Sequence, residues 1–158
     1  MGHHLRGAQQ AQHPGRLMLA PATRWVALRL GRRGAILLCY GAVWALYGYA
    51  QIASPPPDQR GLQPLLELAP LAAWGWLWVV AGLLAVVSAW LPTGRDWPAY
   101  PALQLVVLPW MGCYLATWLM GDYPRGWIAA AVWGLISVPV WVTAGWPEPP
   151  RVKRVSSA

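Results

Sequence analysis

Residues 68–94 read LAPLAAWGWLWVVAGLLAVVSAWLPTG and contain no Asp, Glu, Lys, Arg or His. Three further stretches share this property, at 34–57, 97–121 and 126–147. Each of the four stretches is 22 to 27 residues long, and about 20 apolar residues suffice for a helix to cross the roughly 30 Å hydrocarbon layer of a bilayer. The sequence therefore predicts an all-α protein, a polytopic transmembrane four-helix bundle.

Proline lies at or beside most ends of the uncharged stretches, where a missing backbone N–H costs a helix least. The transmembrane domain is expected at 34–146, with spans at about 34–52, 70–91, 101–120 and 124–145. Between the first two spans, the segment 62–69 (LQPLLELA) is expected along the outer surface of the membrane, with Glu67 reaching water.

The remaining chain is polar or basic. Residues 1–20 show no apolar period and are expected to form a disordered tail, in which Met18 is an alternative start to Met1. Residues 21–33 carry four arginines and are expected to form a basic interfacial segment. Residues 147–158 are expected to form a basic cytoplasmic tail.

The distribution of charge predicts an orientation. The net charge is +7, from 12 Lys and Arg against 5 Asp and Glu. An N-terminus inside the cell leaves ten basic residues in cytoplasmic segments and two, Arg60 and Arg125, outside. Because cytoplasmic loops are enriched in Lys and Arg, we expect both termini in the cytoplasm and a plasma-membrane location. Basic residues that flank spans favour anionic lipid headgroups over nucleic acid, so no nucleic-acid partner is expected.

The span interiors offer few groups for chemistry. They hold no acid, base or histidine at mid-depth, whereas proton relays and coupled transporters need ionisable residues there. The three histidines, His3, His4 and His13, all lie in the N-terminal tail. We therefore expect no catalytic residue, no cofactor and no metal ligand. Gln104, about a turn into the third span, is expected to hydrogen-bond a neighbouring helix.

Three other positions, two cysteines and one aspartate, have simple structural interpretations. Cys39 and Cys113 differ in expected depth by roughly 13 Å at about 1.5 Å per residue, which is too far for a disulfide. We expect both to pack as small apolar residues. Asp122 is expected either to cap the fourth span or to pair with Arg125 in the short outer turn.

Small residues recur every four positions in all four spans, and such spacing lets helix backbones approach closely. The pattern predicts packing within the chain or, alternatively, self-association through one of these faces. The candidates are Gly41 and Ala45 in the first span, Ala81, Ala85 and Ala89 in the second, Gly112 and Ala116 in the third, and Ala130 and Gly134 in the fourth.

Two prolines lie inside spans. Pro109 and Pro139 are expected to kink their helices and to release the backbone carbonyls near Leu105 and Leu135. Adjacent kinks would either shape the bundle or open a small cavity. Ser137 lies close enough in sequence to satisfy a released carbonyl.

The chain has 13 tryptophans, which favour the boundary between water and lipid. The outer boundary is expected at Trp74, Trp76, Trp78, Trp118 and Trp127, and the inner one at Trp25, Trp90, Trp97 and Trp146. Trp44, Trp110 and Trp133 fall deeper, where they are expected to pack between helices or, alternatively, to contact a ligand.

Four segments, RGAILLCYGAVWALYGYAQ (33–51), PPPDQRGL (55–62), GDYPRGW (121–127) and TAGWPEPP (143–150), resemble small uncharacterised four-span membrane proteins of GC-rich actinobacteria and their phages. The resemblance covers about residues 33–150. It implies an integral membrane protein and carries no activity or site residue.

The expected function is therefore that of a small integral plasma-membrane protein of structural or accessory type, without catalytic activity of its own. Its expected partners are anionic lipids and either further copies of itself or another membrane protein. Small size, charge-poor spans and small-residue faces also fit a holin-like pore former or lysis accessory. A transporter subunit is a third possibility if a partner supplies the polar groups.

Overall fold

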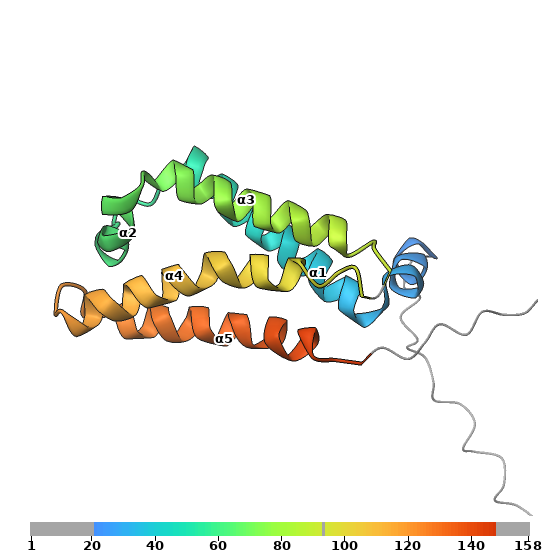
Figure 1. Cartoon of the computed structure of the whole chain (residues 1–158). Helices are drawn as coiled ribbons and strands as arrows, with labels where there is room; N and C mark the ends of the chain where they lie inside the picture. Colours follow the sequence, from blue (N-terminus) through green and yellow to red (C-terminus); the bar gives the residue numbers. More distant parts are fainter. Residues whose placement is uncertain (1–20, 93, 148–158) are drawn as a thin grey trace, which may run out of the picture.

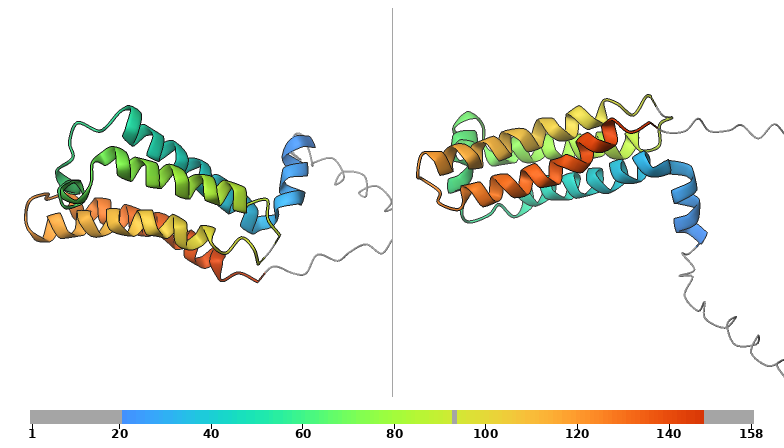
Figure 2. Two further views of the ribbon diagram at one scale, coloured as in Figure 1. Left: turned by 45° about the horizontal axis from the view of Figure 1, so that its top comes forward. Right: turned by 90° about the horizontal axis from the view of Figure 1, so that it is seen from below.

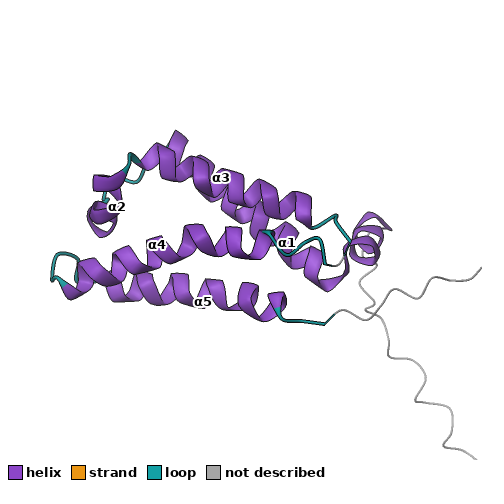
Figure 3. Cartoon of the chain, viewed as in Figure 1, coloured by secondary structure: helices purple, strands orange, loops and turns teal. Residues whose placement is uncertain are grey.

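The computed structural model describes residues 21–92 and 94–147, and every regular element within these ranges is helical (Figures 1 and 3). In chain order the elements are α1 (Pro21–Ala53), the 3₁₀ turn η1 (Arg60–Leu62), α2 (Gln63–Leu68), α3 (Leu71–Ser88), α4 (Ala99–Leu119) and α5 (Gly126–Ala144). Four stretches are long and apolar enough to cross a membrane, namely Leu30–Ala53 within α1 and the whole of α3, α4 and α5. The prediction of an all-α protein with four apolar helices is confirmed. The tail predictions for 1–20 and 148–158 fall outside the described residues.

Helix α1 changes direction at Gly31. This residue has φ 67° and ψ −176°, a conformation that side-chain-bearing residues scarcely adopt because their Cβ clashes with the backbone. The first turns of α1, residues 21–30, therefore leave the axis of the bundle at a steep angle (Figure 2). This bend suits a helix lying on a membrane surface, although the interfacial position of 21–33 stays a prediction.

The four long helices are arranged as two antiparallel hairpins. Helix α1 packs along α3, and α4 packs along α5, over most of their lengths (Figure 2). The hairpins meet mainly through α3 and α4, whereas α1 and α5 touch at few points. The bundle is thus closed on its α3–α4 side and more open between α1 and α5.

The connection from α1 to α3 covers one end of α4. After Pro55–Pro57 the chain turns through η1, where Gly61 lies directly against the ring of Tyr114 on α4. Helix α2 follows at the same end of the bundle (Figure 1), and Glu67 on it is exposed. The expected surface segment is therefore a short helix held against α4.

The turn from α4 to α5 is closed by the backbone. Gly121 has φ +85°, and the amides of Gly121 and Asp122 donate to the carbonyls of Trp118 and Thr117, each at 3.0 Å. This pattern is the Schellman motif, which satisfies the last carbonyls of a helix. Arg125, not Asp122, occupies the N-cap position of α5, and no side chain caps that helix.

The prediction for Asp122 is therefore wrong on both counts, because Asp122 also forms no ion pair with Arg125 within the described residues. Its position is fixed instead by its backbone amide, which belongs to the cap of α4.

Both internal prolines lie within helices that continue past them. Hydroxyl groups bind carbonyls close to Pro139: Ser137 Oγ donates to Gly134 at 2.8 Å, and Thr143 Oγ1 donates to Pro139 itself at 2.6 Å. Ser137 therefore hydrogen-bonds the Gly134 carbonyl, which is next to the Leu135 carbonyl that Pro139 is expected to release. The kinks at Pro109 and Pro139 remain predictions.

Candidate functional site

A seam of glycines closes the first hairpin. Gly34, Gly41 and Gly48 recur every seven residues on α1, and Gly75, Gly82 and Ala89 do so on α3. The two series run antiparallel, so that Gly48 faces Gly75, Gly41 faces Gly82 and Gly34 faces Ala89. A seven-residue spacing keeps one face of a helix against its neighbour as the pair coils gently.

The seam leaves no room for side chains. A Cβ built on Gly82 would lie 2.5 Å from the Gly41 carbonyl oxygen and from the Ala45 amide nitrogen. A Cβ on Gly48 would lie 2.5 Å from the Gly75 carbonyl oxygen. Since these neighbours are backbone atoms, they cannot move aside as a side chain can. The α1–α3 contact is therefore a backbone-to-backbone contact of the kind that small residues permit between membrane helices.

An aromatic cluster joins the two hairpins at Trp78. Its ring lies 5.5 Å from that of Trp44, 4.8 Å from Tyr47, 5.5 Å from Trp110 and 5.3 Å from Trp133, measured between centroids. Tilted and edge-on arrangements dominate, as the quadrupoles of aromatic rings favour. The cluster draws on all four long helices and forms side-chain contacts between the hairpins.

The prediction that Trp78 marks the outer boundary is wrong, because its side chain is 0% exposed. By contrast Trp76, Trp118 and Trp127 are exposed, as a boundary position requires. Trp74 is half-buried and donates through Nε1 to the Leu65 carbonyl at 3.0 Å, which ties α3 to α2. Near the opposite end Trp90, Trp97 and Trp146 are exposed, and nothing is described of the Trp25 side chain.

Three polar groups in or beside the cluster donate to the bundle's own atoms, whereas Nε1 of Trp78 has no partner within the described residues. Trp44 Nε1 donates to the Leu103 carbonyl at 3.2 Å, and Tyr40 Oη donates to the Ile136 carbonyl at 3.1 Å. Trp110 Nε1 donates to Tyr47 Oη at 3.1 Å. The expected deep packing of these tryptophans is thus confirmed for Trp44 and Trp110, which are both buried.

A groove lies beside this cluster, where α1 and α5 touch at few points. It encloses about 290 Å³, at the lower end of the range for small-molecule sites. Its walls are Cys39, Tyr40, Val43, Trp44 and Tyr47 of α1, Trp78 of α3, and Trp133 and Ile136 of α5. The free surface of these walls is apolar.

Polar side chains within the second hairpin also bind backbone carbonyls. Gln104 Nε2 on α4 donates to the Ser137 carbonyl on α5 at 3.1 Å, which confirms the expected contact with a neighbouring helix. Three buried polar atoms have no hydrogen-bond partner within the described residues: Oε1 of Gln51, Oε1 of Gln104 and Nε1 of Trp78. Cys39 and Cys113 are both free thiols, as expected, and Cys113 is buried; Cys39 is exposed, so the prediction that it packs within the bundle is wrong.

An arginine clamp holds the other end of the bundle together. Arg33 Nε donates to Asp96 Oδ2 at 3.1 Å and to Tyr100 Oη at 3.2 Å. Its Nη1 donates to the Trp146 carbonyl at 2.9 Å, and its guanidinium lies 5.1 Å from the centre of the Tyr100 ring. Asp96 is 4% exposed and also accepts from the Gly94 amide at 3.1 Å. One side chain of α1 therefore binds the α3–α4 loop, α4 and the segment that follows α5.

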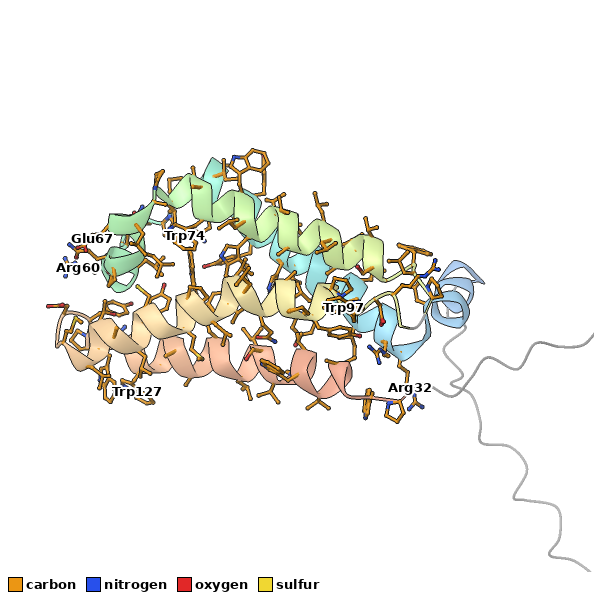
Figure 4. The ribbon with its side chains drawn as sticks, viewed as in Figure 1. Arg32, Arg60, Glu67, Trp74, Trp97 and Trp127 are labelled. Atoms are coloured by element: carbon orange, nitrogen blue, oxygen red, sulfur yellow. The ribbon has the colours of Figure 1, made fainter. Side chains whose placement is uncertain are left out.

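This clamp could not be predicted from the sequence, because Arg33 and Asp96 are 63 residues apart and each looks like an ordinary flanking charge. Other described charged side chains also lie at the ends of the bundle (Figure 4). Arg60 and Glu67 lie at the end that carries α2, and Arg32 lies at the opposite end.

The small-residue candidates fall into three groups. Those that are buried are Ala81, Ala85, Ala89 and Ala130, together with Gly41. Those that are half-buried are Ala45, Ala116 and Gly134, and a Cβ on Gly134 would lie 3.4 Å from Met111 Sδ. Gly112 is exposed, and a Cβ there would meet nothing within 4 Å. The close contacts of Gly34, Gly48, Gly75, Gly82 and Gly126 were missed, although the seven-residue spacing of the first four is visible in the sequence.

Comparisons with known proteins found no match to a family model, to a curated protein or to a solved structure. No group of three or more His, Cys, Asp or Glu side chains gathers within 21–92 and 94–147, and His3, His4 and His13 lie outside those ranges. The four apolar helices indicate a multi-pass membrane protein.

Proposed function

We propose that this chain is a plasma-membrane protein of structural or accessory type, which acts through the surfaces of its helices and has no catalytic activity of its own. One observation carries the proposal: the polar side chains that form hydrogen bonds within the spans bind atoms of the same bundle, while the outward faces are large and apolar. Gln104, Tyr40 and Trp44 each donate across a helix interface. Outward side chains such as Leu105 and Leu135 are more than 70% exposed.

The orientation with both termini in the cytoplasm belongs to the same proposal. It is supported by the excess of basic residues on the side of the termini, ten against two. It is also supported by the helix before Gly31, which leaves the bundle axis at the end of the bundle that carries Arg32 and Arg33 (Figure 2).

Photo-crosslinking from the outward faces tests an accessory role. A benzophenone amino acid is placed singly at Leu46, Leu83, Leu105 or Leu135, one on each long helix and all exposed. An accessory protein should give a discrete protein adduct from one or two neighbouring faces in its native membrane. Protein adducts from none of the four positions would contradict the proposal.

A pore-forming or lysis role is the competing proposal, which small-residue faces such as that of Gly112 support. A hydrated pore needs polar surfaces lining it, whereas the outward faces of α3 and α5 carry Val80, Leu84, Val132 and Val138. Inducible expression with a leakage dye separates the two roles. We expect the membrane to stay tight at high expression, and dye release at low expression would favour the pore.

A further inference from the structure

The wall of the α1–α5 groove continues along α1 to an exposed arginine. Arg32, Ile36, Cys39 and Val43 follow one another at intervals of three or four residues, so they share one face of the helix. Cys39 and Val43 line the groove, and Arg32 is exposed. This face therefore combines a positive charge at its end with an apolar hollow along its length.

The groove begins within the leaflet next to Arg32 and extends to about the middle of the bilayer. At about 1.5 Å per residue, Cys39 is about 10 Å and Tyr47 about 22 Å from Arg32 along the helix axis. The hydrocarbon of one leaflet is about 15 Å deep, half of the roughly 30 Å core. A lipid whose headgroup meets Arg32 would therefore place its acyl chain beside the groove.

Arg32 differs from the neighbouring Arg33 in what it binds. The Arg33 guanidinium is engaged by Asp96, Tyr100 and the Trp146 carbonyl. Arg32 forms no ion pair within the described residues. It lies at the end of the bundle where α5, the opposite wall of the groove, also ends (Figure 4). The exposed guanidinium of Arg32 is therefore accessible to an anion at this end of the bundle.

We propose that the α1–α5 groove binds one acyl chain of an anionic phospholipid whose phosphate pairs with Arg32. The apolar walls suit hydrocarbon, and the volume suits a chain. A helix about 10 Å wide fills about 900 Å³ over 12 Å of its length, about three times the 290 Å³ that the groove encloses. The proposal needs only that the helices span a membrane, and it holds for either orientation.

Native mass spectrometry of the full-length protein tests the proposal, after incubation in micelles with equal amounts of phosphatidylglycerol and phosphatidylcholine. Val43→Trp fills the groove, and Val80→Trp is its control, since Val80 is similarly exposed (60% against 55%) but lies on α3 away from the groove. Arg32→Ala removes the charge, and Arg95→Ala is its control, since Arg95 is also exposed and is only one residue from the clamped Asp96.

We expect one retained phosphatidylglycerol per protein in the wild type, Val80→Trp and Arg95→Ala proteins, and at least fivefold less in Val43→Trp and Arg32→Ala. Equal retention in Val43→Trp and Val80→Trp would overturn the site, and equal retention of both lipids would overturn the role of Arg32. If Val43→Trp instead converts a dimer to monomers, a second copy occupies the groove and the proposal is wrong.

The unaltered protein offers a second readout that does not depend on a variant folding. Cys39 is exposed and lines the groove, whereas Cys113 is buried elsewhere. Phosphatidylglycerol should slow alkylation of Cys39 by an apolar maleimide at least fivefold relative to phosphatidylcholine. An alkylation rate that is the same in both lipids would contradict the proposal.

Discussion

The α1–α3 hairpin brings two backbones into contact at glycine, whereas the α4–α5 hairpin is joined largely by side chains. In the first hairpin, three facing pairs follow a seven-residue spacing and no proline interrupts the spans of either helix. In the second, Gly126 lies against the Tyr114 carbonyl at one end, and farther along Gln104 bridges to the Ser137 carbonyl. Each of its helices also contains a proline.

The difference shows two ways of holding helices together where apolar burial no longer favours helix over lipid. Where the backbones of α1 and α3 lie close together, dispersion contacts form along the whole glycine seam, and no side-chain atom can be added there. Hydrogen bonds between side chain and backbone tolerate substitution, but each one stabilises the hairpin at a single point. The Trp78 cluster then joins the two hairpins, because its ring contacts Trp44 on α1, Trp110 on α4 and Trp133 on α5.

The largest expected effect is that of Gly82→Leu. The new Cβ would stand 2.5 Å from backbone atoms of α1, so the helices must separate, at a cost above about 3 kcal/mol, beyond the usual range for overpacking. We expect little folded protein in size-exclusion chromatography. Gly112→Leu is the control, since a Cβ there meets nothing within 4 Å. If both variants melt like the wild type, the glycine seam is not what closes the first hairpin.

Trp78→Ala should lower the free energy of unfolding by about 3 kcal/mol, because it leaves a large cavity where the hairpins meet. Trp78→Phe should cost much less, since it keeps a ring and removes an indole N–H that has no partner within the described residues. Thermal melting in detergent measures both. Trp76→Ala, on the same helix but 59% exposed, should melt within a few degrees of the wild type.

Asp96→Asn should destabilise the bundle by about 2 kcal/mol, between the values for exposed and buried ion pairs, because Asp96 and Arg33 are 6% and 13% exposed at their side chains. A double-mutant cycle with Arg33→Ala measures their coupling. The control is Arg60→Ala, since the Arg60–Asp58 pair is exposed and 3.9 Å apart. Additive effects of the two mutations would show that the clamp does not join the hairpins.

The smallest expected effect is that of Gln104→Leu, within about 0.6 kcal/mol of the wild type. The variant loses the hydrogen bond to Ser137 but also removes a buried Oε1 that has no partner within the described residues. Thermal melting checks this expectation. A loss comparable with that of Trp78→Ala would mean that the second hairpin depends on a polar bridge.

The four helices could be predicted from the sequence because charge is absent over lengths that match a membrane. The rotation of each helix about its own axis could not be predicted, since each helix carries apolar residues on every side. Gly112 and Gly82 look equivalent in the sequence, yet one faces outward and the other is buried in the seam. The depth of Trp78 along its span likewise predicts a boundary position, but depth does not tell that its side chain is buried in the bundle.

The sequence offers a small cavity only as one result of the two proline kinks, and the groove is not that cavity, because neither Pro109 nor Pro139 lines it. It follows instead from the loose contact of α1 with α5, a property of tertiary packing. The Arg33–Asp96 contact also depends on packing, because only the folded chain brings the start of the first span beside the loop before α4.

In the proposed topology both hairpins cross the bilayer completely, with both termini in the cytoplasm. Substituted-cysteine labelling tests it most directly, in a chain whose Cys39 and Cys113 are replaced by Ala. Single cysteines replace Asp58, Asp122 or Arg95, all of which are exposed in turns.

We predict that an impermeant maleimide labels positions 58 and 122 in intact cells, and position 95 only after permeabilisation. Labelling of 58 and 95 from the same side would contradict the spanning bundle. Labelling of 95 alone in intact cells would contradict the orientation.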